Sequence, residues 1–195
     1  GGMGAYSPAP VVTPAVHDWV MQHVIYPTVN GMAAEGTVFT GFLYAGLMIA
    51  PDGSAKVLEF NCRFGDPETQ PIMLRLQSDL VELCLAATQT QLAGKAIDFT
   101  SEAAVGVVLA AGGYPDSYAK GKVISGLDGA DSASAKVFHA GTEFNGNDVV
   151  TNGGRVLCAT ALGSNVTAAQ KAAYQLADKI SWDGMFCRTD IGYRA

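Results

Sequence analysis

A short segment in the first half of the chain contains the side chains best suited to chemistry. Residues 57–70 read Val-Leu-Glu-Phe-Asn-Cys-Arg-Phe-Gly-Asp-Pro-Glu-Thr-Gln. On a β-strand, side chains two residues apart share a face, so Glu59 and Asn61 would lie about 7 Å apart on one face. A carboxylate and an amide oxygen are hard ligands that suit a Mg²⁺ ion in contact with substrate phosphates. The alternative is a surface strand with two outward polar residues, since Glu-x-Asn is short and common.

The loop after this strand concentrates charge. Arg63, Asp66 and Glu68 lie within six residues of one another, around Gly65 and Pro67, which would fix a bend. The planar guanidinium of Arg63 could bind a phosphate or a carboxylate through two hydrogen bonds. The alternative is a loop that satisfies itself, in which Arg63 pairs with Asp66 or Glu68.

Glycine-rich stretches are the other candidates for anion binding. Gly1, Gly2 and Gly4 belong to an opening Gly-Gly-Met-Gly loop whose backbone N–H groups could hold an anion. The pairs at 112–113 and 153–154 are more often turns than phosphate-binding loops. A chain that opens inside a loop is also what we expect of a fragment of a longer protein.

Several other chemistries find no support. His17 and His23 are six residues apart and do not share the helix face that a metal site needs, and His139 lies in a predicted strand. The sequence lacks the G-x-S-x-G elbow, the P-loop pattern and the H-E-x-x-H motif. Nucleophilic catalysis by a side chain is therefore not indicated.

The bulk composition indicates a globular protein that either handles small molecules or is an interaction domain. The 195 residues are 49% hydrophobic and 15% charged, and the net charge is −6. An acidic chain lacks the basic surface that a nucleic-acid binder needs. The four cysteines form no C-x-x-C pair and fit a reducing cytoplasm. We expect no membrane span and see no signal peptide.

The elements that must position these residues can be read from capping and periodicity. Thr13 before Pro14 predicts a helix start, the Tyr26-Pro27 step is expected to break or restart that helix, and Gly36 is expected to end it. An apolar strand over 38–50, with both faces expected to be covered, turns into a second strand over 55–61.

The second half of the chain predicts more strands and a final helix. Asp79 is a plausible cap for a helix over the 80s, and periodicity is lost over 92–100. Strands are expected over 104–111, 135–140 and 155–163. A capping box at Thr167 is expected to start the last helix, with a buried stripe at Ala169, Ala173, Leu176 and Ile180. Together these elements predict an α+β or mixed α/β chain with two lobes.

The segment 58–70 closely resembles the phosphoribosylamine–glycine ligase family, also called glycinamide ribonucleotide synthetases, within the ATP-grasp superfamily. Other strings resemble the same family in the same order along nearly the whole chain. These strings are residues 1–8, 42–48, 110–115, 137–141, 151–156 and 187–192.

The resemblance implies a fold, a reaction and a site. It implies that residues 1–98 complete an ATP-grasp domain, an antiparallel sheet with flanking helices, and that 99–195 form a small C-terminal α+β domain. These ligases use ATP and Mg²⁺ (or Mn²⁺) to join glycine to 5-phosphoribosylamine through a glycyl phosphate. By resemblance, Glu59 and Asn61 bind the metal, Arg63 faces a phosphate or a carboxylate, and Asp66 and Glu68 line the pocket. Gly1, Gly2 and Gly4 would lie near the substrate.

Two departures from the family pattern matter. Residues 43–49 offer no further acidic metal ligand, and the lysines and lid that hold ATP in this family would precede residue 1. The chain alone is therefore expected to be inactive without its N-terminal half. Two other interpretations stay open: an inert binding or structural module, and a different ATP-grasp carboxylate–amine ligase. The Asp-Pro-Glu-Thr-Gln loop argues against the latter.

Overall fold

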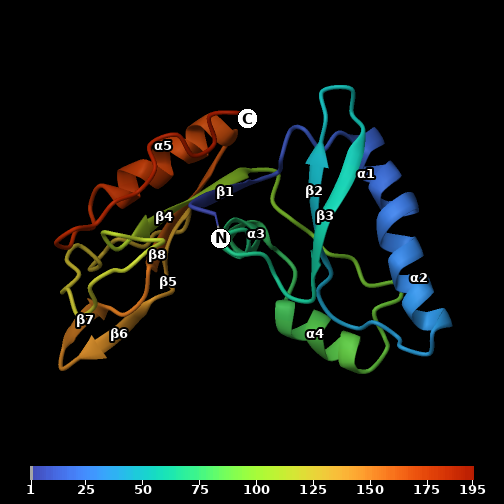
Figure 1. Ribbon diagram of the computed structural model, residues 1–195, viewed down its shortest axis with the longest axis horizontal. Helices are drawn as coiled ribbons and strands as arrows, with labels where there is room; N and C mark the ends of the chain where they lie inside the picture. Colours follow the sequence, from blue (N-terminus) through green and yellow to red (C-terminus); the bar gives the residue numbers. More distant parts are fainter. Residues whose placement is uncertain (1) are drawn as a thin grey trace. The chain divides into compact units, whose positions relative to one another are not determined.

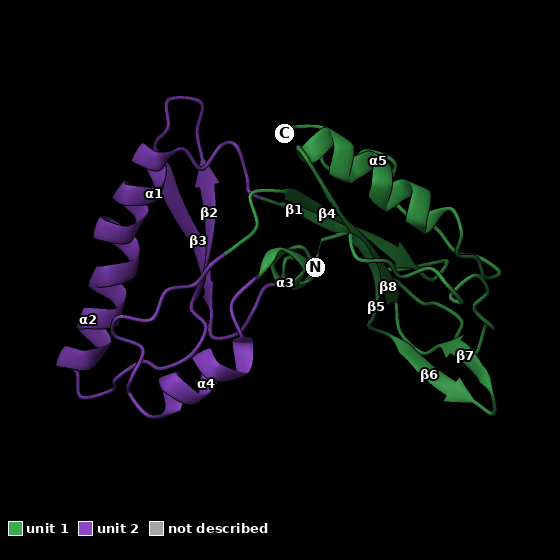
Figure 2. Cartoon of the chain, turned by 180° about the vertical axis from the view of Figure 1, so that it is seen from behind, with its two compact units in different colours: residues 1–7, 66–76, 99–195 green, residues 8–65, 77–98 purple. Residues whose placement is uncertain are grey.

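The computed structural model describes residues 2–195, which form two compact units. We call them the sheet unit, residues 1–7, 66–76 and 99–195, and the hairpin unit, residues 8–65 and 77–98 (Figure 2). The chain therefore passes from one unit to the other four times. Each unit is described by itself below.

A four-stranded antiparallel sheet forms the centre of the sheet unit (Figure 1). Its strands follow the order β1-β4-β8-β5, so neighbours in the sheet come from distant parts of the sequence. Their bounds are Gly4–Ser7 for β1, Ala103–Ala110 for β4, Arg155–Gly163 for β8 and Ala135–His139 for β5. A separate hairpin joins β6, Thr142–Asn145, to β7, Asp148–Thr151.

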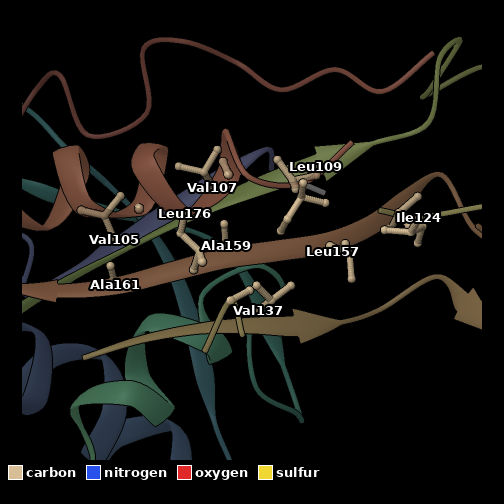
Figure 3. Close-up of a cluster of buried hydrophobic side chains, with 14 of the residues drawn as sticks. Val105, Val107, Leu109, Ile124, Val137, Leu157, Ala159, Ala161 and Leu176 are labelled. Atoms are coloured by element: carbon tan, nitrogen blue, oxygen red, sulfur yellow. The ribbon is translucent and has the colours of Figure 1, made fainter. Parts of the chain in front are cut away.

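Every residue of strand β4 is buried, because helices cover both faces of the sheet there. Helix α5, Val166–Ala177, packs with Val105, Val107 and Leu109 in the main apolar core (Figure 3). Helix α3, Thr69–Arg75, packs against β4 and β8, and a Cβ added to Gly106 would lie 3.2 Å from the Pro71 Cγ. The uniformly apolar sequence of β4 is thus that of a strand buried on both faces.

The hairpin unit contains three α-helices, one π-helical turn and a two-stranded sheet. Strand β2, Tyr44–Ile49, pairs antiparallel with β3, Ala55–Asn61, as the turn signal between them predicted. Helix α4, Leu80–Thr88, begins after Asp79, whose carboxylate accepts hydrogen bonds from Val81 and Glu82 N–H. Helices α1, Pro14–Val20, and α2, Tyr26–Ala34, flank a π-helical turn over Met21–Ile25.

One local prediction about the hairpin unit is confirmed and two need correction. The predicted restart at the Tyr26-Pro27 step is confirmed, because α2 begins at Tyr26 after a π turn in which the Tyr26 N–H donates to the Met21 carbonyl five residues back. The first strand begins at Tyr44 instead of residue 38. Its sheet is not covered on both faces within residues 2–195, where Met48 and Leu58 are exposed.

The last helix also starts differently from the prediction. Asn165, not Thr167, is the N-cap, and its side-chain oxygen accepts a hydrogen bond from Ala168 N–H at 2.9 Å. Both residue types cap helices well, and the tertiary position of the chain decides between them. The predicted stripe of Ala169, Ala173, Leu176 and Ile180 is buried, although Ile180 follows the helix.

The division into residues 1–98 and 99–195 stays a prediction, and the compact units combine segments from both ranges. Residue 99 does begin a long stretch of the sheet unit, but residues 1–7 and 66–76 belong to that unit as well. The reason is that β1 pairs with β4 along its whole length and α3 covers the same strand. Within residues 2–195, no helix has the length and apolar character needed to cross a membrane.

Substituting Leu176→Ala should lower the free energy of unfolding by about 2–5 kcal/mol, because it leaves a cavity between α5 and the sheet. Urea denaturation followed by the fluorescence of the buried Trp182 measures this. The control is Leu85→Ala on α4, where an exposed leucine should change stability by less than about 0.5 kcal/mol. Equal effects of the two substitutions would contradict the assignment of this core.

Cys158 should resist thiol labelling at pH 8, whereas the exposed Cys62 should react. Burial raises the pKa of the Cys158 thiol from 9.0 to about 11, despite its hydrogen bond with Thr160. The folded protein therefore holds this proton more tightly than the unfolded chain, and the resulting stabilisation is lost as the pH rises from 9.0 through about 11. Mass spectrometry after alkylation, with and without urea, tests this, and similar native rates for both thiols would refute it.

Candidate functional site

Strand β3 positions the predicted metal pair in the hairpin unit. Glu59 lies opposite Gly46, and Asn61 lies opposite Tyr44, in a regular stretch of the antiparallel ladder. The register shifts just before this stretch, so that Leu58 is an extra residue on β3. Bulges of this kind re-aim the following side chains and are frequent beside active sites. Because the ladder is regular from residue 59 to residue 61, the two polar side chains share one face.

Gly46 leaves room for the carboxylate of this pair. A Cβ atom added to Gly46 would lie 3.0 Å from the Cγ atom of Glu59, so the acidic side chain rests against the glycine backbone. Glu59 is exposed and Asn61 is half-buried, and both are open to a ligand. The local sequence thus combines a β-bulge, a small residue across the ladder and two oxygen donors at the end of a strand.

The donor set of this face fits a hard divalent cation held partly by its substrate. Carboxylate and amide oxygens are preferred by Mg²⁺, which often takes only one or two protein ligands and completes its shell with water and phosphate. Within residues 2–195, no group of three or more His, Cys, Asp and Glu side chains is arranged to hold a metal ion. Glu59 and Asn61 offer two oxygen donors, a number with which proteins commonly hold Mg²⁺ beside water and phosphate, and their role as metal ligands stays a prediction.

Arg63 lies in the same unit, two residues beyond the strand. Its guanidinium Nη1 donates a hydrogen bond to the Phe64 carbonyl at 2.8 Å, which turns the side chain along its own loop. The ring of Phe64 lies 3.9 Å, centroid to centroid, from the ring of Phe42 and anchors the loop. The exposed guanidinium keeps further N–H donors for an anion.

Asp66 and Gly2 both accept hydrogen bonds from Arg155, a residue to which the sequence analysis gave no role. In the sheet unit, Nη2 of Arg155 donates to the Asp66 carboxylate at 2.6 Å. Its Nη1 donates to the backbone carbonyls of Gly2 and Asp66, each at 3.0 Å. The Arg155 side chain is only 20% exposed, so these bonds are partly shielded from water. One guanidinium thus holds the two predicted segments together.

The glycines before Arg155 allow the chain to place it there. A Cβ added to Gly153 would lie 2.8 Å from the Gly141 Cα, and one added to Gly154 would lie 2.3 Å from the Tyr114 ring. Close approach therefore explains this pair better than either a turn or a phosphate-binding loop. A lone arginine after two glycines carries no spacing signal, which is why sequence reasoning missed it.

Gly4 and Glu68 line a cavity of about 440 Å³ in the sheet unit. Gly4 is the first residue of β1 and not part of a loop, and Glu68 immediately precedes α3. The remaining wall comes from the segment 188–194, which brings in two further arginines, Arg188 and Arg194. The predicted Gly1 lies outside the described residues.

The predicted site residues therefore fall into two sets. Glu59, Asn61 and Arg63 belong to the hairpin unit, and Gly2, Gly4, Asp66 and Glu68 belong to the sheet unit. Within the sheet unit the structure joins Gly2 to Asp66 through a hydrogen-bonded arginine and places Gly4 and Glu68 in one cavity. Anion binding and divalent-metal binding are the chemistries that these two sets support.

Two family models match the chain, in order. The model described as phosphoribosylglycinamide synthetase, ATP-grasp (A) domain, matches residues 1–69. The model described as phosphoribosylglycinamide synthetase, C domain, matches residues 104–194. Together they cover most of the chain.

Two curated relatives from different bacteria carry the same name, phosphoribosylamine–glycine ligase. A phosphoribosylamine–glycine ligase of Vibrio cholerae is 70% identical over 195 residues, which is all of this chain and 46% of the relative. The ligase of the same name from Escherichia coli is 63% identical over 196 residues, with the same shares. The chain thus spans about half the length of the curated relatives it matches.

Solved structures agree on the fold. A phosphoribosylamine–glycine ligase from Thermotoga maritima matches 97% of this chain with a TM-score of 0.82 and 36% identity, over 46% of its own length. The biotin carboxylase domain of a 2-oxoglutarate carboxylase from Hydrogenobacter thermophilus matches 95% of this chain, over 40% of its own length, with a TM-score of 0.62. At 14% identity this second likeness shows the fold alone.

A double-mutant cycle of Arg155→Ala and Asp66→Ala should give a coupling free energy of about 1 kcal/mol in the stability of the protein. We expect this coupling because the ion pair between Arg155 and Asp66 is partly shielded from water and includes a hydrogen bond of 2.6 Å. Urea denaturation of the four proteins measures the coupling. The control cycle removes Lys136 and Asp131, an exposed pair at 2.8 Å in the same unit, and should give less than about 0.5 kcal/mol. Equal couplings would mean that the pair between Arg155 and the Asp66 carboxylate contributes no more to stability than an exposed ion pair.

Proposed function

Because the chain belongs to the phosphoribosylglycinamide synthetase family, we propose that it is the C-terminal portion of the ATP-dependent ligase that joins glycine to 5-phosphoribosylamine. The observation that carries this proposal is the match of the whole chain to ligases of that name, with the Glu59 and Asn61 pair at the end of β3. The activity is that of the longer protein, of which residues 1–195 supply one part. The product would enter purine biosynthesis as glycinamide ribonucleotide.

The proposed reaction has two steps, transfer of a phosphoryl group to glycine and then formation of the amide bond. An oxygen of the glycine carboxylate attacks the γ-phosphorus of ATP, and ADP leaves with the electrons of the broken P–O bond. The amine of phosphoribosylamine then attacks the carbonyl carbon of glycyl phosphate, phosphate leaves, and the amine nitrogen loses a proton. Neither step needs a nucleophile from the protein, so catalysis consists of positioning and charge stabilisation.

Glu59 and Asn61 would hold the magnesium ion, or manganese, that accompanies ATP. When bound, the ion supplies neutralisation of phosphate charge. The two side chains share a face, and Gly46 leaves space beside the Glu59 carboxylate. The protein's own contribution is thus to present two oxygen donors on a strand whose register is fixed by antiparallel pairing.

The remaining predicted residues would bind and orient the substrates. Arg63 would place N–H donors against a phosphate or a carboxylate, because its guanidinium is exposed beyond β3. Asp66 and Glu68 would line the substrate pocket, and Arg155 fixes the backbone and carboxylate of Asp66. We further propose that Gly1, Gly2 and Gly4 lie near the substrate, where backbone can approach closely.

We propose that residues 1–195 alone do not turn over substrate, because they span about half the length of the ligases that they match. The four cysteines are free thiols, which favours a reducing compartment such as the cytoplasm.

The proposal is tested with a chimera that joins residues 1–195 to the upstream part of the Vibrio cholerae ligase, which is 70% identical over the shared region. The chimera should form glycinamide ribonucleotide from glycine, phosphoribosylamine and ATP, and residues 1–195 alone should not. Glu59→Ala with Asn61→Ala should lower kcat by about 10²–10³-fold, because transition-state charge loses its stabilisation. Coupled detection of ADP and mass spectrometry of the product measure both.

The matched control is Lys56→Ala, an exposed position on the same strand outside the proposed site. It should leave kcat within about twofold. Turnover of a different amine or carboxylate by the chimera, without glycinamide ribonucleotide, would reject the proposed reaction. Equal activity of the Lys56 variant and the double variant would reject the metal pair while leaving the reaction in place.

A further inference from the structure

Charged side chains of residues 188–194 line the cavity of the sheet unit, and the proposed reaction assigns them no role. It measures about 440 Å³, within the range of small-molecule sites. Residues 4–6 of β1 and Glu68 form one part of its lining, and residues 188 and 190–194 form the other. All of these residues belong to one compact unit.

Arg194 is the cation in this cavity without an ion pair in the described chain. Its Nε donates to the Tyr193 hydroxyl at 2.7 Å, and its guanidinium carbon lies 5.2 Å from the centre of that ring. The nearby ring orients the guanidinium but does not neutralise its charge. An anionic ligand would do so.

Arg188 contributes a second guanidinium in a fixed position. Its Nε and Nη2 donate to the two carboxylate oxygens of Asp190 at 2.8 and 2.6 Å, which holds the pKa of that carboxyl below its usual value. This bidentate pair uses only part of the five-donor fork, and Nη1 remains on the other side of the guanidinium.

Helix α5 holds the backbone of this wall in place. The Tyr174 hydroxyl donates to the Arg188 carbonyl at 2.7 Å and accepts from the Ile191 N–H at 3.0 Å. The Gln170 amide donates to the Ile191 carbonyl at 2.6 Å. On the other side, a Cβ added to Gly4 would lie 2.5 Å from the Ile191 Cγ2, so β1 and the wall are in close contact. The cavity is therefore built on rigid elements, as a binding site requires.

The lining matches a ligand that carries a phosphate and hydroxyl groups together. Arg188 and Arg194 offer donors for an anion, while Asp190 and Glu68 offer acceptors for hydroxyl or amine hydrogens. Glycine is far smaller than this cavity, and the proposed metal pair on β3 accounts for the phosphates of ATP. The remaining anion among the proposed substrates is the phosphate of phosphoribosylamine.

We propose that this cavity binds the ribose 5-phosphate portion of phosphoribosylamine, with Arg194 and Arg188 on the phosphate and Asp190 on the sugar. This assignment rests on the proposed ligase function. Arg194 would then be a binding residue for phosphoribosylamine. Tyr174 and Gln170 would be positioning residues, because they hold the backbone of Arg188 and Ile191.

Substituting Arg194→Ala in the chimera described above should weaken the binding of ribose 5-phosphate by about 10- to 100-fold, because charge-assisted hydrogen bonds to the phosphate are lost. Isothermal titration with ribose 5-phosphate measures this without turnover. In the assay, KM for phosphoribosylamine should rise by a similar factor, while KM for glycine and for ATP should not change. Arg194→Lys should recover part of the loss, because it restores the charge without the fork.

The matched control is Lys120→Ala, which removes one exposed positive charge from the same unit outside the cavity. It should leave binding within about twofold. Unchanged ribose 5-phosphate binding in Arg194→Ala would overturn the proposal, as would a selective rise in KM for glycine. Inorganic phosphate binding as tightly as ribose 5-phosphate would also overturn it, since the sugar would then make no contact.

Two outcomes distinguish a failure of the proposed ligase function from a failure of the proposed sugar-phosphate site. A chimera that forms no glycinamide ribonucleotide but binds ribose 5-phosphate through Arg194 would reject the ligase function and keep the sugar-phosphate site. A chimera that is an active ligase, with unchanged kinetics in Arg194→Ala, would keep the ligase function and reject the site.

Discussion

Both faces of strand β4 are buried, and the sheet unit is organised around that constraint. Covering an all-apolar strand requires helix α5 on one side and helix α3 on the other, with β1 and β8 along its edges. These elements come from three separated stretches of the chain. The same packing brings Gly2, Asp66 and Arg155 together, because each flanks an element that covers or borders β4.

Much of the local structure could be predicted from sequence, where the signal was itself local. Strand β3 has the predicted bounds, 55–61, because a turn and an apolar alternation define it. Thr13 and Asp79 cap helices as expected, since a cap bonds only to the next few residues. Strand β1 and helix α3 were not predicted, because each is short and is specified by contacts with β4 and not by its own periodicity.

The residues of the candidate site also differ in how far the local sequence predicts them. Glu59 and Asn61 could be paired from sequence, because a strand places alternate residues on one face. Arg155 could not be assigned a role in the same way, since its partners Gly2 and Asp66 lie 153 and 89 residues away. Arg188 and Arg194 bond to near neighbours, but the cavity that they line also takes residues 4–6 from the far end of the sequence. Their positions depend on the close approach of glycine backbones and on hydrogen bonds from α5, which only the tertiary fold determines.

The fourfold passage of the chain between its two units limits how such a protein can be divided. A cut after residue 98 would remove β1 and α3 from the sheet unit, which would uncover an edge and a face of β4. The two family models match consecutive blocks of this chain, whereas its compact units are interleaved. Recombination at a single point would therefore exchange incomplete folding units, so we expect the two units to have been inherited together and to diverge as one piece.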